Sequence, residues 1–414
     1  MSEKNMSTAD EMLDVVIGGG GYVGLSLALA LKQSEPDMKV ALVDLRPRSA
    51  IENDPRASAI AAAASRMLDQ LGVWHQLQDD AQPINDMIVT DSKLHDSVRP
   101  VYLTFDGEVE EGEPFAHMVP NNRMVGALHD EAVREGVTII APESIDDFST
   151  DAASVTIRLR SGEMLHSRLL VAADGVRSKL RGLAGIPVNR WDYKQSGIVT
   201  TVAHERPHNG RAEEHFLPSG PFAILPLTGN RSSIVWTEKP LEAERLVNGD
   251  EFTFEIELER RFGRHLGELS LDGPRAAFPL SLTLARSFIG NRFVLAGDAA
   301  HGIHPIAGQG LNYGFKDVAA LAEVLVDAHR LGLDIGAAHI LERYQTWRRF
   351  DTYRMGVTTD MLNRLFSNDF DVVRGVRDFG LGLVERMPFM KKMFVGEAAG
   401  TTGTTPKLLI GNPI

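Results

Sequence analysis

Glycines near the start of the chain have a spacing that could hold a phosphate group. The stretch from Asp14 to Gly24 reads Asp-Val-Val-Ile-Gly-Gly-Gly-Gly-Tyr-Val-Gly, so Gly19, Gly21 and Gly24 form the pattern G-x-G-x-x-G. In this pattern one glycine turns the chain, one lets the backbone approach a pyrophosphate, and one lets the next helix lie close to the strand. The N–H groups at the start of that helix would face the phosphates.

An acidic residue follows at the distance expected for a nucleotide ribose. Val40 to Val43 predicts a second strand, and Asp44 ends it about twenty residues beyond the glycines. Asp44 is therefore the expected acceptor for the adenosine ribose hydroxyls. Strand, glycines, a helix over residues 22–32, strand and acid, in this order, predict a dinucleotide site. The alternative is a glycine-rich strand-to-helix turn that binds nothing.

Two later segments each combine an apolar strand with an aspartate and a glycine. The first begins at Leu169 and ends in Asp174-Gly175, and the second begins at Arg292 and ends in Gly297-Asp298. Each aspartate could instead only cap the turn at the end of its strand. The second segment continues into a predicted helix over residues 313–329.

The residues between Gly297-Asp298 and that helix could lie against a planar ring. Gly308 and Gly310, followed by Leu311 and Asn312, let the backbone approach closely, and the positive end of the helix would stabilise negative charge on a bound ring. Asp298, His301 and His304 also have the spacing D-x-x-H-x-x-H. Because no fourth ligand is evident in the sequence, we expect no metal site.

The three motifs together resemble those of the aromatic-hydroxylase family of FAD monooxygenases, in which they wrap one FAD. The resemblance places Asp298 at the ribityl or pyrophosphate region, and Asp174 and Gly175 near the pyrophosphate and the approach of the reductant. Arg56 and Arg123 match further positions on the FAD side. The cofactor-binding residues implied are Gly19, Gly21, Gly24, Asp44, Arg56, Arg123, Asp174, Gly175, Gly297, Asp298, Gly308, Gly310, Leu311 and Asn312.

The composition excludes other classes. The 414 residues suffice for a cofactor domain and a substrate domain, and the net charge of −13 argues against a nucleic-acid partner. The sequence has no cysteine, which excludes disulfides, thiolate metal sites and dithiol redox chemistry. Residues 1–13 lack the apolar core of an export signal, so we expect a cytoplasmic location. The uncharged stretch 15–31 fits strand, turn and helix better than a membrane span.

The predicted fold class is α/β: a Rossmann-like FAD-binding domain, an inserted antiparallel β-sheet domain for the substrate, and a C-terminal helical segment. Alternating segments such as His215-Phe-Leu-Pro, Ala223-Ile-Leu-Pro-Leu and Ser232-Ser-Ile-Val-Trp-Thr predict the inserted sheet. We expect the FAD domain to comprise residues 1–75, 113–185 and 284–352, the substrate domain 76–112 and 186–283, and the helical region 353–414. Candidates for an apolar pocket are Phe216, Phe222, Leu225, Trp236, Phe278 and Leu280, most of them expected in the core.

Four segments make the resemblance finer: Gly220-Pro221 with Leu225-Pro-Leu227, Ala277-Phe-Pro-Leu280, Tyr344-Gln-Thr-Trp-Arg-Arg349, and Arg364-Leu-Phe366. They look like the ubiquinone-biosynthesis hydroxylases, which oxidise polyprenylated phenols. One departure is Gly18, where that family usually has valine. A second is His304, where the broader aromatic hydroxylases often carry proline.

The resemblance implies a single-component hydroxylase. NAD(P)H would dock transiently and reduce FAD, oxygen would add to the flavin as a hydroperoxide, and its distal oxygen would pass to a lipophilic phenol. His301 and Pro305 are the candidate catalytic residues, with His301 as the base for the phenol proton, although a structural imidazole is the commoner outcome. The alternatives are a flavin-dependent dehydrogenase or reductase of an isoprenoid substrate, and a non-catalytic FAD-binding component of a quinone-biosynthesis complex.

A lipophilic substrate also suggests contact with the inner membrane or with other ubiquinone-biosynthesis proteins. Val372, Val376, Phe379 and Leu383 recur at helical spacing, and basic residues lie close by. Such a surface suits anionic lipid or a partner helix. Packing of this helix on the FAD domain is the alternative.

Overall fold

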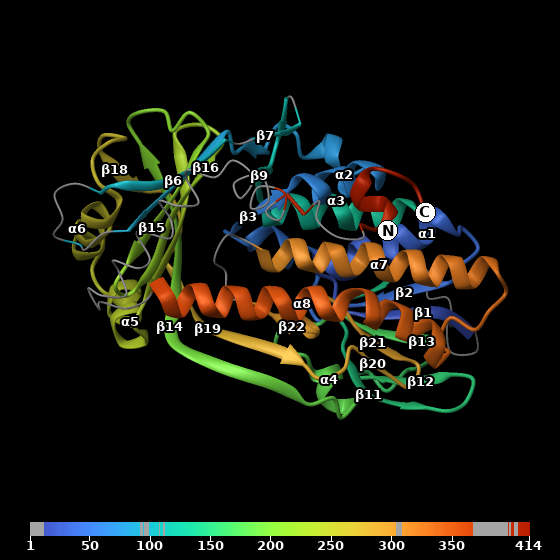
Figure 1. The fold of residues 1–414 in the computed structure, drawn as a ribbon. Helices are drawn as coiled ribbons and strands as arrows, with labels where there is room; N and C mark the ends of the chain where they lie inside the picture. The colour runs from blue at the N-terminus through green and yellow to red at the C-terminus, as the bar shows by residue number, and fades with distance from the viewer. Residues whose placement is uncertain are drawn as a thin grey trace.

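The protein is described by a computed structural model that covers residues 12–91, 94, 99–106, 108–110, 112–303, 309–366, 396, 399–400 and 405–414. Two large sheets lie toward opposite ends of the molecule, and the helices α7 (Gln309–Arg330) and α8 (Ala338–Phe366) run side by side across it (Figure 1). The predicted α/β class with an inserted sheet is confirmed. No helix among the described residues is long and apolar enough to cross a membrane.

The first sheet carries the dinucleotide fingerprint. Its strands in spatial order are β10 (Thr138–Ile140), β2 (Val40–Val43), β1 (Met12–Gly18), β13 (Met164–Ala172), β12 (Val155–Leu159) and β11 (Ile145–Thr150), with β21 (Phe293–Leu295) beside β13 and β20 (Ile289–Gly290) beside β21. Strands β2, β1, β13 and β21 are parallel, so their carboxyl ends meet at one edge. All three sequence motifs end at that edge, where ligands of open α/β sheets bind.

Helices cover the central strands of this sheet, whose side chains are mostly buried. Val15, Val16 and Ile17 in β1 are fully buried, as expected for a parallel strand covered on both faces. The covering helices include α1 (Tyr22–Ser34), α3 (Asn121–Arg134) and α7. Shorter elements complete this half: η2 (Arg48–Asn53), α2 (Ala62–Gln70), η3 (Trp74–Gln76), α4 (Lys179–Leu183) and the small sheet β3 (Ala57–Ala61), β9 (Ala116–Pro120) and β4 (Gln82–Pro83).

The second sheet is mostly antiparallel. Its order is β22 (His301–Gly302), β19 (Ala276–Ala285), β14 (Val188–His204), β17 (Arg231–Glu238), β16 (Gly220–Leu227), β15 (Arg211–Leu217), β5 (Asp86–Asp91) and β6 (Val101–Asp106), with β18 (Leu269–Leu271) beside β14. One face packs on α5 (Pro240–Asn248) and α6 (Glu251–Phe262) around Phe222, Trp236 and Phe254. The hairpin β7 (Glu108–Glu110) and β8 (Glu113–Pro114) lies apart. The predicted strands at 215, 223 and 232 are confirmed as parts of β15, β16 and β17.

Helix α8 connects the two halves. It runs without a break across position 352, where we expected the FAD domain to end, and it contacts β20 of the first sheet and β16 and β19 of the second. Near the C-terminus η6 (Lys407–Ile410) returns to the first half, where Leu408 and Leu409 are buried in its core. The apolar face expected over residues 372–383 lies outside the described residues.

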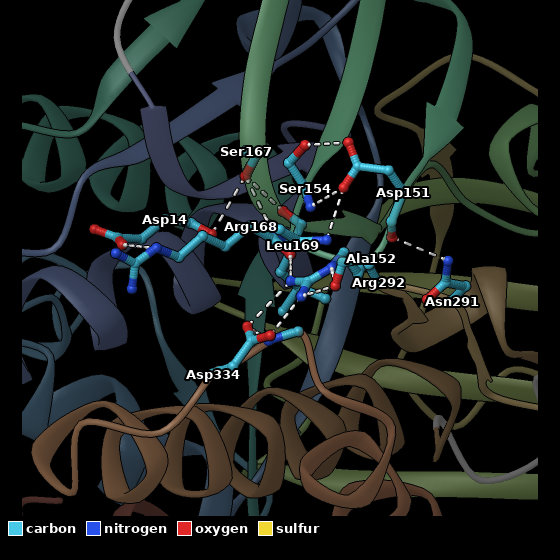
Figure 2. Close-up of polar contacts among 12 residues, drawn as sticks. Asp14, Asp151, Ala152, Ser154, Ser167, Arg168, Leu169, Asn291, Arg292 and Asp334 are labelled. Carbon is cyan, nitrogen blue, oxygen red and sulfur yellow. Dashed lines mark hydrogen bonds and ion pairs between the residues drawn. The ribbon is translucent and has the colours of Figure 1, made fainter.

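The start of β21 is held by a single buried arginine. The Arg292 guanidinium donates to the carbonyl oxygens of Ala152 and Arg168 at 2.6 and 3.0 Å and pairs with the Asp334 carboxylate. Figure 2 shows these bonds converging on Arg292 from three separate segments. They fix the start of β21, and Gly297-Asp298 follows shortly after the end of this strand.

Candidate active site

The three fingerprint glycines occupy three different steric environments. Gly19 has φ +117°, and a Cβ there would lie 2.3 Å from the carbonyl oxygen of Ala173; a Cβ on Gly24 would lie 1.9 Å from the carbonyl oxygen of Gly19. A Cβ on Gly21 would meet nothing within 4 Å. The first and third glycines therefore allow close backbone packing, while the second leaves open the space through which a pyrophosphate would approach.

The open space beside Gly21 is a cavity of about 440 Å³. Asp44 lines it from the end of β2, and its carboxylate accepts the N–H groups of Gly20 and, at 2.6 Å, Arg46. These two bonds orient the carboxylate toward the cavity at the position predicted for the ribose acceptor. The remaining lining includes Glu143, Lys179 and Asp174.

Asp174 has one satisfied and one unsatisfied oxygen. Its Oδ2 accepts the N–H of Leu180 at 3.1 Å, so the aspartate does cap the turn after β13, as the alternative interpretation held. Its Oδ1 is buried and has no hydrogen-bond partner among the described residues. The next residue, Gly175, has φ +84° and allows the chain to turn here. The unsatisfied acceptor lines the cavity and fits a ligand that donates a hydrogen bond.

Asp298 lies where this cavity meets a second one. It belongs to the short helix η4 (Gly297–Ala299), which follows β21, and together with Tyr22 it lines both cavities. Gly297 has φ +60° and lies against Val23 of α1. Burial raises the pKa of Asp298, and the nearby His301 and Arg56 only partly oppose this effect. Tyr22 and Asp298 line both cavities, an arrangement that fits a dinucleotide bound across the two.

A buried carboxylate behind η4 holds the motif in place. Asp317 of α7 accepts the N–H of Gly297 at 2.9 Å, His301 Nε2 at 2.5 Å and Arg348 Nε at 2.8 Å. Burial disfavours its ionisation, but His301 and Arg348 outweigh burial and lower the pKa of Asp317. Asp317 thus connects η4, β22, α7 and α8 through one side chain, a contact that the sequence motifs did not reveal.

The second cavity, of about 300 Å³, lies between the two halves of the molecule. From the first half it is lined by Arg56, Gly310, Leu311 and Asn312, and from the second by β5, β15, β16 and β17. Helix α7 begins at Gln309, earlier than predicted, so Gly310 to Asn312 form its first turn. The Asn312 amide accepts the N–H of Ala61 and donates to the carbonyl of Ala59, both at 2.9 Å. Asn312 therefore also fixes strand β3.

One face of the second sheet supplies the far wall of this cavity. Ala223 and Leu225 of β16 line it, whereas Phe222, which alternates with them, lies in the core on the other face. Of the six apolar pocket candidates, Leu225 lines this cavity, and Phe278 lines a neighbouring one of about 350 Å³. Trp236 is fully buried on the core side.

Glu214 is an ionisable side chain in this wall that sequence reasoning missed. It lines the cavity from β15 and is 6% exposed, and burial raises its pKa to about 7. The adjacent Glu213 points to the other face, where it contacts His215 and His265 at 3.0 and 2.8 Å. Two consecutive glutamates in a strand must face opposite sides, and this was the signal available in the sequence.

The remaining site candidates are placed as follows. Arg56 lines the second cavity and pairs with Asp54 at 2.7 Å. Arg123 is mostly exposed, donates to Asp80 at 2.6 Å, and is not among the residues that line these cavities in the described structure. The His301 side chain is completely buried behind η4 and likewise is not part of the described lining. Pro305, Gly308 and His304 lie outside the described residues.

Comparison with known proteins agrees with this geometry. The FAD binding domain family matches residues 12–350. The chain is 44% identical over 414 residues to ubiquinone hydroxylase UbiL of Rhodospirillum rubrum, covering 98% of this chain and 95% of that protein. It is 33% identical over 401 residues to 3-demethoxyubiquinol 3-hydroxylase of Escherichia coli K12, with coverage of 94% and 98%.

Solved structures show the same fold at lower identity. p-Nitrophenol 4-monooxygenase PnpA from Pseudomonas putida DLL-E4 superposes with a TM-score of 0.78 at 20% identity, covering 95% of this chain and 99% of that one. PqsL, a probable FAD-dependent monooxygenase from Pseudomonas aeruginosa, gives 0.74 at 21% identity, with coverage of 89% and 100%. The family match and the two relatives show that the chain is an FAD-dependent aromatic monooxygenase. Within that class the chain belongs to the FAD-dependent hydroxylases of ubiquinone biosynthesis.

Proposed function

We propose that this enzyme hydroxylates the aromatic ring of a polyprenylated phenol, using NAD(P)H and O₂. The observation that carries the proposal is the pair of cavities joined at Tyr22 and Asp298: one has the features of a nucleotide site, and the other has an apolar wall supplied by the substrate sheet. A flat aromatic ring placed in the second cavity would lie between η4 and that wall. The names of the relatives support ubiquinone precursors as the substrate class.

The residues present fit FAD at this site. Gly19, Gly21 and Gly24 would admit the pyrophosphate, Asp44 would bind the ribose, and the unsatisfied Oδ1 of Asp174 would accept a hydrogen bond from the cofactor. At the other end Arg56, Gly297, Asp298, Gly310, Leu311 and Asn312 would surround the ring system, with Gly175, Arg123 and Gly308 retained as predicted contacts. Bound FAD supplies the activation of oxygen, while the chain's own residues orient the phenol and exclude water.

The sequence has one dinucleotide fingerprint, so NAD(P)H would dock transiently beside the flavin and leave. Asp317 keeps η4 fixed during this exchange through its three hydrogen bonds. His301 would act there as a positioning residue, because its ring is buried against Asp317, and Pro305 stays a predicted contact of the ring.

Membrane contact belongs to the same proposal, since a polyprenylated phenol resides in the bilayer. Its support is the sequence alone: apolar residues at helical spacing from Val372 to Leu383, near basic ones. Flotation with anionic vesicles tests it, and a protein that stays in solution would contradict it. Docking to another protein of ubiquinone biosynthesis is the second expectation for this surface.

The decisive experiment supplies the FAD-loaded protein with NAD(P)H, a short-chain polyprenylphenol and isotopically labelled O₂. The product should carry one added oxygen atom with the label, found by mass spectrometry. Consumption of NAD(P)H with saturation of an isoprenoid double bond, and without labelled product, would indicate the dehydrogenase alternative.

A further inference from the structure

Glu214 is the ionisable side chain among the described residues of the sheet wall that surrounds the second cavity, which also includes Thr237. Its neighbours in that wall include Ala212, Pro221, Ala223 and Leu225, which are apolar. Within the described part of the chain no hydrogen bond or ion pair to the Glu214 carboxyl is found, although the residue is 6% exposed. An ionised carboxylate in such surroundings is costly unless a partner reaches it.

The geometry of β15 explains why this carboxyl faces the cavity. Side chains of a strand alternate, and β15 pairs with β16 so that Glu214 lies opposite Ala223, which also lines the cavity. Glu213 and His215 therefore point to the opposite face, where they contact each other. The charged or titratable groups that share the cavity with Glu214 are Tyr22, Arg56 and Asp298, all from the first half.

None of these three groups neutralises Glu214. Arg56 is engaged by Asp54 in two hydrogen bonds, and Tyr22 holds its proton because burial raises its pKa. Asp298 would add like charge if it were ionised. A ligand in this cavity that carries a hydrogen-bond donor would supply the partner that the ionised carboxyl lacks among the described residues.

We propose that Glu214 accepts the proton of the substrate's phenol hydroxyl; this inference rests on the proposed function. As the ring carbon forms its new bond to oxygen, the O–O bond of the oxygen donor that bound FAD would supply breaks and leaves its electron pair on the donor's other oxygen. At the same time the phenolic O–H bond breaks and its electron pair moves into the ring. The proton forms an O–H bond with a carboxylate oxygen of Glu214. When the ring carbon releases its hydrogen as a proton, the donor's remaining oxygen takes up that proton, aromaticity is restored, and the proton on Glu214 returns to the phenol oxygen.

Burial supports this role by keeping the pKa of Glu214 near 7, which is suitable for a base that works at neutral pH. His301 lacks the corresponding access, because its ring is fully buried and bonded to Asp317. Glu214 is thus placed to be a catalytic residue of the substrate sheet.

Binding measurements test the inference without turnover. The FAD-loaded protein is titrated with a 4-alkylphenol and, separately, with the matching 4-alkylanisole, which has no O–H donor, and binding is followed by the change in flavin absorbance. Phenol affinity of the wild type should rise about tenfold between about pH 5.5 and 8.5, because a charged acceptor makes the stronger hydrogen bond. The anisole affinity should not rise.

Two variants distinguish the role of the Glu214 carboxyl from the general effect of removing a charge from β15. Glu214→Gln should abolish the rise, whereas Glu213→Gln, on the same strand but the opposite face, should keep it. Flavin content and thermal unfolding verify that each variant is folded. A wild type without the rise, an equal rise for the anisole, or an unchanged rise in Glu214→Gln would each overturn the inference.

Turnover provides a second readout. Glu214→Gln should lower the rate of phenol hydroxylation by about 10²-fold and remove the ionisation near neutral pH from its pH profile, with reduction of the flavin by NAD(P)H unchanged. An unchanged hydroxylation rate would contradict the role of Glu214 in catalysis. If the wild type shows the pH-dependent phenol binding but forms no hydroxylated product, the proposed function fails while Glu214 remains the phenol acceptor.

Discussion

Two buried carboxyl groups, one in each half of the molecule, have opposite surroundings. Asp317, behind the flavin motif, accepts three hydrogen bonds, and its pKa is lowered even though burial opposes ionisation. Glu214, in the substrate sheet, has an apolar wall around it, and burial raises its pKa to about 7. Asp317 finds its partners inside the half that holds the cofactor, whereas the Glu214 carboxyl has no hydrogen bond or ion pair to any described residue.

The difference follows from what each half must do. A cofactor that stays bound needs a fixed backbone, and Asp317 fixes Gly297 by a direct hydrogen bond. A substrate enters and leaves the site in each turnover. If another protein group were bonded to the Glu214 carboxylate, that group would compete with the substrate for it. The predictions below test each side of this contrast.

The largest effect is expected at Asp317. Replacing it with alanine leaves the Arg348 guanidinium buried without its main acceptor, so we expect a loss of about 3–5 kcal/mol in the free energy of unfolding, together with weaker FAD binding. Asp327→Ala on the same helix is the control, since Asp327 makes an exposed pair with Arg343 at 3.5 Å and should contribute less than about 0.5 kcal/mol. If the two variants lose the same free energy of unfolding in denaturant, the buried Asp317 stabilises the fold no more than the exposed Asp327 does.

Replacing Glu214 should have the opposite effect on stability, and this effect should depend on the pH at which the free energy of unfolding is measured. Its folded-state pKa of about 7 lies above the ordinary value of 4.5, so the folded protein holds the proton more tightly. This contribution to stability is complete below about pH 4.5 and is lost as the pH rises through 7. Above pH 7 Glu214→Gln should therefore be more stable than the wild type by up to about 3 kcal/mol, and near pH 4.5 the two should agree.

The neighbouring Glu213 provides the matched comparison. Burial alone would raise its pKa, but hydrogen bonds from His215 and His265 lower it to about 2. Its stabilising contribution is present above the unfolded value of about 4.5 and is lost as the pH falls toward 2. Glu213→Gln should thus be less stable than the wild type at neutral pH, the reverse of Glu214→Gln. The same sign for both variants in pH-dependent unfolding would show that the two faces of β15 do not differ as described.

A smaller effect is expected for the cofactor itself. Asp298→Ala should weaken FAD binding by about 1.5–3 kcal/mol, the range for a hydrogen bond to a charged group, measured by titration of the apoprotein with FAD. Asp334→Ala serves as the control because Asp334 anchors the other end of β21 through Arg292 (Figure 2). The control should lower stability and leave the FAD affinity unchanged. An unaltered dissociation constant in Asp298→Ala would take this residue out of the site.

The sequence motifs predicted the cofactor half well because local geometry decides it. Gly24 packs on Gly19 within the first motif, Gly297 turns through its own backbone conformation, and Gly19 packs on Ala173 of the second motif, so each of these features lies within the motifs themselves. The three motif-bearing strands β1, β13 and β21 meet at one edge because they are parallel, and a regular alternation of apolar strands and helices already indicates that arrangement.

The partners of those motifs could not be predicted in the same way. Asp317 lies sixteen residues beyond His301 and reaches Arg348 on another helix, so the contact depends on how α7 and α8 pack. Glu214 is one of two adjacent glutamates, and the sequence does not say which face of β15 is turned to the cavity. The side of a strand that faces a ligand is set by sheet packing, which involves residues far apart in the chain.

The smallest effect is expected for packing in the cofactor half, at Gly18, where the sequence departs from the pattern of the family that it resembles. An added Cβ there would lie 2.4 Å from Cδ1 of Leu180 and 3.2 Å from Cδ1 of Ile145, so Leu180 fills the space that a side chain at position 18 would take. Because the obstacle is the end of a flexible side chain, Gly18→Ala should cost only about 1 kcal/mol, the scale of a displaced rotamer. In a Leu180→Val background, which lacks that terminal methyl group, the same change should be neutral or stabilising, since alanine restricts the unfolded chain more than glycine does. The four proteins form a double-mutant cycle in denaturant unfolding, with a coupling of about 1 kcal/mol expected. If Gly18→Ala is equally costly in both backgrounds, Leu180 is not the residue that compensates for the glycine.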